Sequence, residues 1–312
     1  MSTQTPVVEV SATDVLPARG PRGGGRLRRI GIGAASLLLV AAVWELYKLL
    51  GPADGLVLGG TRLLPRTSDL AMPHVTDMLV RLGEPVTRAE GSPPLWLEVA
   101  GAAGVTLGIA GVGWLVGLVV GVGLALAMVR WRVVEFAILP WIVLSQTVPL
   151  IAFAPLVRSW GSRIEIGAFE WQDWMSVAVI ASYLAFFPIA IGALRGLQSP
   201  DAIHAELLRS YAASWWATVV RLRFPASVPY LLPALRLAAA NAVVGAIVAE
   251  VSTGLRGGIG RMIVQYAGQA SGDPAKSWGP IFGAIVLGLV AAGSVALVGG
   301  VLKDYRRGEV DA

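Results

Sequence analysis

The sequence predicts an all-α integral membrane protein with about six transmembrane helices. Of its 312 residues, 55% are hydrophobic and only 14% are charged, which lies well outside the composition of a soluble globular domain. Several uncharged runs reach or exceed the ~20 residues that a helix needs to cross a bilayer. The sequence contains no cysteine, which excludes disulfides, iron–sulfur clusters and thiol catalysis. Two isolated histidines, His74 and His204, are a poor basis for a transition-metal site.

The N-terminal segment, residues 1–29, is rich in Pro, Gly, Ser and Arg and predicts a disordered basic tail. A first span is expected at 30–50. A cleaved export signal is the alternative, but this run is longer than a signal core and more spans follow, which favours a retained helix. The further predicted spans are 99–129, 136–157, 176–194, 226–251 and 281–302.

Together these spans form a predicted transmembrane domain at 30–305, followed by a short tail at 306–312. If the N-terminus is inside, the inner segments carry more Lys and Arg over fewer residues than the outer ones. Both termini are therefore expected in the cytoplasm.

Small residues and prolines are patterned within the spans. Two glycine stripes on roughly opposite sides of the second span predict two closely packed neighbours; they comprise Gly101, Gly104, Gly108 and Gly111, and Gly113, Gly117 and Gly121. Prolines in the third and fourth spans predict kinks; they are Pro140, Pro149, Pro155 and Pro188.

The inner loop 195–225 is built like a helical hairpin. Ser199 reads as an N-cap for a helix from Pro200 to about Tyr211, and Ser214 can cap a second short helix that ends before Pro225. Such a hairpin offers a docking surface on the cytoplasmic face. The alternative is an amphipathic hairpin that lies flat on the lipid headgroups; the aromatic residues that favour it are Trp215, Trp216 and Phe224.

The hairpin and its surroundings resemble the membrane subunits of binding-protein-dependent ABC importers. Glu206 to Pro225 is similar to their cytoplasmic E-A-A-x-x-x-G-x9-I-x-L-P signature, with the Glu and the Pro kept. Replacements stand at the other positions: Leu207 and Leu208 for the two Ala, Ala212 for the Gly, and Leu222 and Phe224 for the Ile and Leu. The segments TLGIAGVGWLVGLVVGVGLALAM (106–128), ILPWIVLSQTVPLIAFAPLV (138–157), FFPIAIGALRGL (186–197) and PALRLAAANAVVGAIVAE (233–250) resemble the sulfonate, taurine, nitrate and thiamine-precursor branch.

This resemblance implies a type I importer permease fold and a set of partners. These are a second permease copy, two cytoplasmic ATPase subunits that bind ATP and Mg, an external solute-binding protein and membrane lipid. It also implies that the hairpin is the coupling element; its candidate residues are Glu206, Leu207, Leu208, Arg209, Ala212, Ala213, Ser214 and Pro225. A left-handed turn at Ala212 would cost about 1–2 kcal/mol, so the turn is either right-handed or strained.

Polar residues inside the spans are candidates for the translocation pathway. Arg236 and Glu250 are 14 residues apart, about 40° around the helix and ~21 Å along it, so they share a face. Each can be an interhelical hydrogen-bond anchor or a contact for solute. Gln146, Thr147 and Asn241 are uncharged candidates.

Two outer segments can also carry function. Residues 51–95 are long for a plain loop and include a weakly amphipathic stretch at 75–82. Residues 160–174 combine aromatic and charged side chains, which is typical of an interfacial belt and also suits docking of a binding protein.

Other classes of protein have less support. The sequence has no phosphate-binding loop of the ATPases, no nucleophile–base or metal pair of an intramembrane enzyme, and no basic stripe interleaved with aromatics for nucleic acid. An ion-coupled secondary transporter is the alternative function, but it would need mirrored repeats with broken helices and a carboxylate at the midplane.

Overall fold

The computed structural model describes residues 25–58, 61–167 and 169–301, and these are almost entirely helical. The chain divides into two units, one up to Ser68 and one from Asp69 onwards, and each is described by itself. Residues 1–24 and 302–312 lie outside the described residues, and with them most of the tail predicted at 1–29 and all of the tail predicted at 306–312.

The first unit contains the first span and a small β-hairpin. Helix α1 is Gly25–Leu50, and the antiparallel strands are β1 (Leu56–Leu58) and β2 (Thr61–Leu64). The Tyr47 hydroxyl donates to the Pro65 carbonyl over 3.2 Å, which ties the end of α1 to the segment after the hairpin. The helix begins five residues before the predicted span, because the basic segment at 25–29 consists mostly of good helix formers.

The second unit begins with a short helix and then alternates long helices with short connections. Its elements are α2 (Val75–Gly83), α3 (Leu95–Arg130), α4 (Arg132–Ser145), α5 (Leu150–Gly161), β3 (Glu165–Ile166), β4 (Phe169–Glu170), α6 (Asp173–Leu197), α7 (Ala202–Ser210), α8 (Trp215–Thr218), the π-helical turn η1 (Val219–Arg223), α9 (Phe224–Thr253), α10 (Ile259–Ala267), the 3-10 turn η2 (Ala275–Ser277) and α11 (Trp278–Val301). The amphipathic stretch predicted at 75–82 is confirmed as α2.

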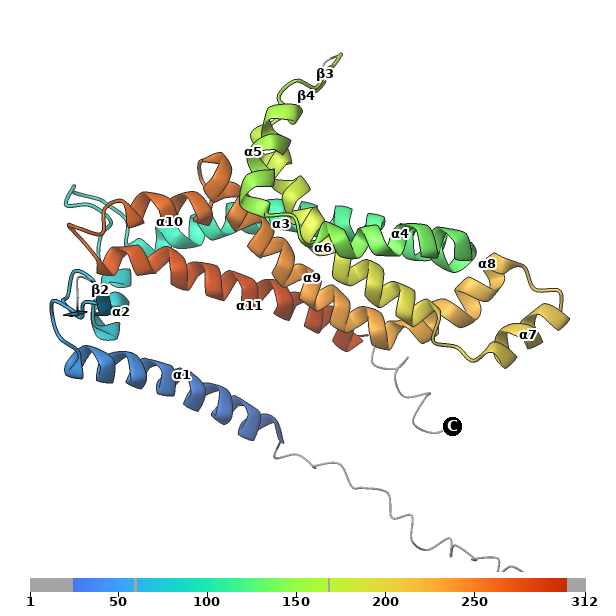
Figure 1. Cartoon of the computed structure of the whole chain (residues 1–312), viewed down its shortest axis with the longest axis horizontal. Coiled ribbons are helices and arrows are strands. Elements are labelled where there is room, and N and C mark those ends of the chain that lie inside the picture. The colour runs from blue at the N-terminus through green and yellow to red at the C-terminus, as the bar shows by residue number, and fades with distance from the viewer. Residues whose placement is uncertain (1–24, 59–60, 168, 302–312) are drawn as a thin grey trace, which may run out of the picture. The chain divides into compact units, whose positions relative to one another are not determined.

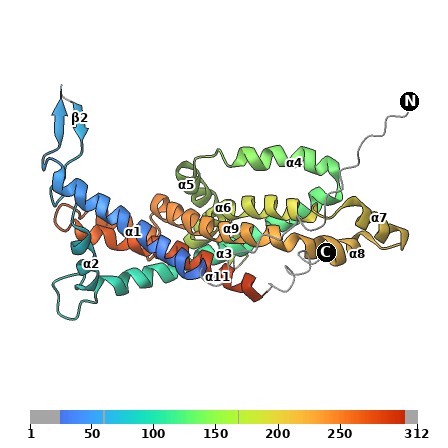
Figure 2. The same cartoon turned by 90° about the horizontal axis from the view of Figure 1, so that it is seen from below.

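Helices α3, α6 and α9 lie side by side and form the centre of the second unit (Figures 1 and 2). The stripe of Gly113, Gly117 and Gly121 allows the close approach of α3 to α6. A methyl group added at Gly117 would lie 2.9 Å from the Cβ of Ala185. This half of the glycine prediction is confirmed. The other stripe, from Gly101 to Gly111, has open space around it within the described chain.

The third predicted span, 136–157, is not one helix. Helices α4 and α5 meet at an angle of 106° across a break of four residues. Among the described residues, five helices are therefore long and apolar enough to cross a membrane, or six if the bent pair counts as one span. Pro149 stands at the N-cap of α5, where a missing N–H removes no helical hydrogen bond. The break is fastened to α6, because the Tyr183 hydroxyl donates to the Ser145 carbonyl.

Candidate coupling hairpin and pathway residues

The helical hairpin predicted from the sequence at 199–225 is present as α7 and α8. The two helices lie at one end of the second unit, and α10 lies towards the other end (Figure 1). The first helix begins at Ala202 rather than Pro200, and Ser199 does not cap it. The Ser199 hydroxyl instead donates to the Gly196 carbonyl over 2.8 Å, because the last carbonyls of α6 are nearer partners than the amides of α7.

The turn between α7 and α8 is left-handed at Ala212. This residue has φ +56°, the only positive φ of a non-glycine residue in the described chain. Its amide donates to the Arg209 carbonyl (2.9 Å), and the Ala213 amide donates to the Leu208 carbonyl (3.0 Å). These two bonds are the pattern of a Schellman motif with Ala where glycine is usual. Of the two possibilities left open by the sequence, the strained turn is the one observed.

The second arm of the hairpin is continuous with α9. The Ser214 side chain accepts from the Ala217 amide, which confirms this residue as an N-cap. The helix does not end before Pro225 as predicted, because the turn η1 widens there: the Phe224 amide reaches back five residues to the Val219 carbonyl. A wider turn makes room for the proline ring within the helical path. The hairpin is therefore the end of a 39-residue helical segment that runs to Thr253.

The first arm of the hairpin presents a mixed charged and apolar surface. Glu206, Leu207 and Arg209 are exposed, and Leu208 is half-buried. Glu206 makes no hydrogen bond or ion pair within the part of the chain that the structure describes. The second arm is held from behind, since the Arg130 guanidinium lies 5.4 Å from the centre of the Trp215 ring. The exposed surface of α7 is therefore joined to an arm, α8, that packs against the end of α3.

Glu250 is completely buried and stabilises the start of α10. The Thr106 hydroxyl lies 2.8 Å from Glu250 Oε1, and the Gly260 amide donates to Oε2 over 2.8 Å. The same Thr106 oxygen accepts from the Ile259 amide over 2.9 Å. A carboxyl group from α9 and a hydroxyl group from α3 therefore satisfy the first two amides of α10.

Glycine makes this contact with α10 possible. A methyl group at Gly258 would lie 2.2 Å from Glu250 Oε1, and one at Gly260 would lie 2.8 Å from the Glu250 Cβ. Sequence analysis identified Glu250 as an anchor or a solute contact, and the geometry is that of an anchor. It missed Thr106 and both glycines. The only sequence signal was three glycines at 257, 258 and 260, shortly after an acid at a span end.

The remaining pathway candidates do not gather at one point. Arg236 is exposed and makes no hydrogen bond or ion pair among the described residues, whereas Glu250 on the same helix is fully buried. Asn241 Nδ2 lies 3.4 Å from the Leu184 carbonyl. Gln146 and Thr147 lie in the break between α4 and α5, and Thr147 donates to the Leu144 carbonyl over 2.8 Å.

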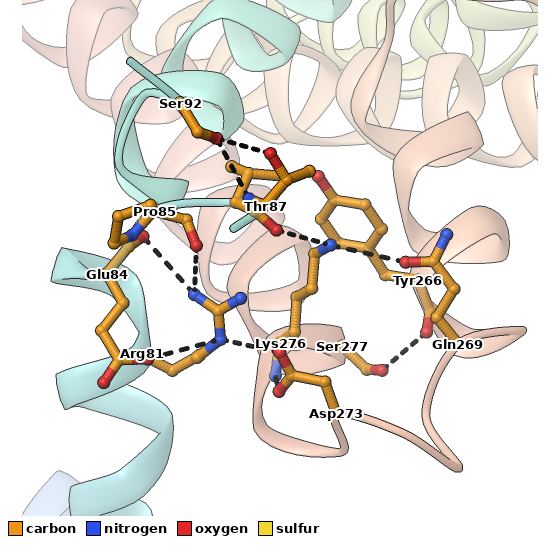
Figure 3. A network of polar contacts seen from close by, with 11 residues as sticks. Arg81, Glu84, Pro85, Thr87, Ser92, Tyr266, Gln269, Asp273, Lys276 and Ser277 are labelled. Atoms are coloured by element: carbon orange, nitrogen blue, oxygen red, sulfur yellow. Dashed lines mark hydrogen bonds and ion pairs between the residues drawn. The ribbon is translucent and has the colours of Figure 1, made fainter. Parts of the chain in front are cut away.

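A polar network that sequence analysis missed fastens α2 to the segment after α10 (Figure 3). Arg81 Nε donates to Asp273 Oδ2 over 2.8 Å, and Arg81 Nη1 donates to the Pro85 carbonyl. The nearly buried Lys276 lies 4.4 Å from the centre of the Tyr266 ring and donates to the Val86 carbonyl over 3.2 Å. The short helix α2 and the segment from α10 to η2 are thus held together by charge and hydrogen bonds.

Tyr266 connects this network to the long helix α3. Its hydroxyl donates to Glu98 Oε2 over 2.7 Å. Burial raises the pKa of the Tyr266 hydroxyl, and the hydrogen bond to Glu98 and the negative charge of that carboxyl raise the pKa further. The hydroxyl therefore stays protonated and remains a donor across the physiological pH range.

Comparison with known proteins agrees with this architecture. The family of binding-protein-dependent transport system inner membrane components matches residues 117–303. The chain is 32% identical to a formylaminopyrimidine transport permease protein, ThiX, of Halalkalibacterium halodurans, over 65% of this chain and 76% of that protein.

Two further relatives have the same kind of description. A putative aliphatic sulfonates transport permease protein, SsuC, of Bacillus subtilis is 26% identical over 72% of this chain and 70% of its own length. A riboflavin transport system permease protein, RibX, of Chloroflexus aurantiacus is 30% identical over 44% of this chain and 47% of its own length.

The fold and these matches define a multi-pass membrane component of an ATP-driven importer. The chain belongs to the family of binding-protein-dependent transport system inner membrane components. It is a non-enzymatic permease subunit that works with a separate ATPase and an external binding protein.

Proposed function

We propose that two identical copies of this chain form the translocation pathway for a small organic solute, and that α7–α8 is the contact of each copy with an ATPase subunit. The supporting observation is the exposed surface around Glu206, which is continuous through α8 and η1 with the long helix α9. A permease cannot hydrolyse ATP itself, so the conformational change of the ATPase must be transmitted to it through a contact of this kind.

The proposed orientation places both termini and the hairpin on the cytoplasmic side of the bacterial inner membrane. Basic residues near the inner ends of the spans support it, because cytoplasmic segments carry an excess of Lys and Arg. The relatives are named for small organic substrates, which supports the same broad class here.

Charge reversal at the exposed Glu206 tests the coupling role. Glu206→Lys should leave the permease folded and inserted while it abolishes ATP-driven uptake and weakens co-purification of the ATPase, since an unpaired charge in a partly desolvated contact costs about 2–5 kcal/mol. The matched control is Glu90→Lys, at an exposed residue before α3. Wild-type uptake and ATPase recovery in Glu206→Lys would remove the coupling role from the hairpin. A hairpin that merely lies on anionic headgroups predicts stronger membrane contact instead.

The described part of the chain has a single α-helical hairpin of this kind, which supports the homodimer because two ATPase subunits need two contacts. Gentle purification with the co-expressed ATPase should give a complex of two permeases and two ATPases by native mass spectrometry. A stable complex of one with one, or a different second permease in equal amount, would refute it.

Arg236 is proposed to face the pathway. An exposed guanidinium in a transmembrane segment costs several kcal/mol in hydrocarbon, which favours a wet cavity around it. Arg236→Leu should therefore lower uptake per folded molecule. Uptake that falls only in proportion to the protein level would make Arg236 a structural residue.

A further inference from the structure

A polar cavity of about 460 Å³ lies beneath the hairpin at the inner end of the second unit. Its walls come from the end of α3, the start of α4, the α6–α7 link, α7 and the last residue of η1. The charged residues that line it are Arg132, Glu135 and Arg223. Glu135 accepts a hydrogen bond from Gln198 over 3.1 Å, so its carboxylate is already engaged.

The arginines leave donors available in this cavity. Arg223 uses Nη1 to bind the Leu197 carbonyl over 2.9 Å, and no hydrogen bond is recorded for its other nitrogens in the described chain. Arg209, on the hairpin, repels Arg223 electrostatically. Arg132 is exposed and forms no ion pair with a described residue. Glu135 keeps its negative charge, because its hydrogen-bond donor Gln198 is a neutral amide, but the two arginines outnumber it and give the cavity a net positive charge that suits an anion. An anion there would also offset the repulsion between Arg209 and Arg223.

An apolar groove of about 340 Å³ precedes the cavity along the same two helices. On α3 the groove contacts Val122 and Leu126, and the cavity contacts Met128 and Val129. On α6 the groove reaches Leu197, and the cavity begins at Gln198. The apolar groove and the cavity therefore adjoin at the ends of both helices, where Leu126 precedes Met128 on α3 and Leu197 precedes Gln198 after α6.

We propose that these two hollows bind one anionic phospholipid, with the phosphate of its headgroup at Arg132 and Arg223 and an acyl chain in the apolar groove. The two hollows match a phospholipid in arrangement as well as in charge, because its apolar acyl chain adjoins its anionic phosphate as the apolar groove adjoins the cavity. Phe136, which lines the cavity, is 78% exposed, so the cavity adjoins an apolar surface that lipid can reach. The bound lipid would connect α7 to the ends of α3 and α4.

The experiment uses the full chain in nanodiscs that contain phosphatidylcholine with or without phosphatidylglycerol, followed by native mass spectrometry after transfer to detergent. We expect wild type to retain one phosphatidylglycerol in preference to phosphatidylcholine. Arg132→Gln and Arg223→Gln should each weaken this retention about fivefold. The matched control is Arg221→Gln, an exposed arginine in the same turn as Arg223 that does not line the cavity, and it should behave as wild type.

Added inorganic phosphate distinguishes a free anion from a lipid headgroup. If phosphate displaces nothing and the retained mass is that of phosphatidylglycerol, the lipid assignment holds. If phosphate itself binds and no lipid is retained, the occupant is a free anion and the lipid proposal is wrong. Equal retention in Arg132→Gln, Arg221→Gln and wild type would also overturn it. Since Arg132 is exposed, its variant should fold even if Arg223→Gln does not, and this readout requires no ATPase.

Discussion

Replacing Thr106 by valine tests whether Glu250 anchors α10 or contacts solute. The Thr106 side chain is fully buried, and its oxygen both donates to the Glu250 carboxyl and accepts from the Ile259 amide. Valine has nearly the same shape but neither capacity. An unsatisfied buried amide costs about 1–3 kcal/mol and the lost bond to the carboxyl about as much, so Thr106→Val should destabilise the protein by about 2–6 kcal/mol.

The assay compares three variants by thermal unfolding of the purified protein and by hydrogen exchange of the α10 peptide. Thr106→Ser keeps the hydroxyl and should lose only about 1 kcal/mol for the missing methyl group. Thr147→Val is the matched control, because the Thr147 hydroxyl is exposed and bonds only within its own turn. In Thr106→Val alone, the amides of Ile259 and Gly260 should exchange much faster.

The result that refutes an anchoring role is equal behaviour of Thr106→Val and Thr106→Ser. A change in the KM for uptake without any loss of stability or of α10 protection would place Glu250 among the solute contacts instead. A loss of stability together with faster exchange at α10 identifies the pair as the attachment of α10 to the bundle.

Two further substitutions test local packing and backbone strain. Ala212→Gly should stabilise the hairpin by about 0.5–1 kcal/mol, because glycine adopts φ +56° without a steric penalty, although it loses more conformational entropy on folding. Slower hydrogen exchange in α7 would show this stabilisation. Faster exchange would contradict the left-handed turn. Gly117→Ala should destabilise the protein by about 1–3 kcal/mol, since its methyl group would lie 2.9 Å from the Cβ of Ala185. Gly104→Ala is the control and should be neutral or slightly stabilising, because Gly104 has open space around it in the described structure. Equal melting temperatures of the two variants would contradict the α3–α6 packing.

Most of the architecture could be predicted from the sequence because each signal is local. Uncharged runs locate the long helices, and Ser214 caps α8 as its position indicates. The stripe that includes Gly117 predicts a close neighbour, which is α6. Helix length, capping and small-residue periodicity each depend on a few consecutive turns, so one chain is enough to read them.

The errors occur where a proline has two possible effects. Pro225 was expected to end a helix, but a π-helical turn accommodates it; Pro149 was expected to kink a span, but the chain breaks by 106°. A proline removes one amide in either case, and packing around the site decides which outcome costs less. That packing is not visible in the local sequence.

The attachment of α10 was missed because its partners are far apart in the chain. Thr106 and Glu250 are separated by 144 residues, and Arg81 and Asp273 by 192. Neither pair has a spacing rule, since the fold alone brings the helices together. A buried polar group reveals its partner only when the three-dimensional arrangement is known.

A single helical segment joins the α7–α8 hairpin to the Glu250 anchor of α10. The segment Trp215–Thr253 has 39 residues, which at 1.5 Å each is about 58 Å of helix, longer than the ~40–45 Å of a whole bilayer. Its first turns form the second arm of the hairpin, and its last turns carry Glu250, which holds α10. A displacement of the hairpin can reach α10 without passing through a flexible loop, unless the helix bends at η1 or at the internal prolines Pro229 and Pro233. If the hairpin contacts the ATPase, as we propose, a bend at those positions would be the first to interrupt its mechanical connection to α10.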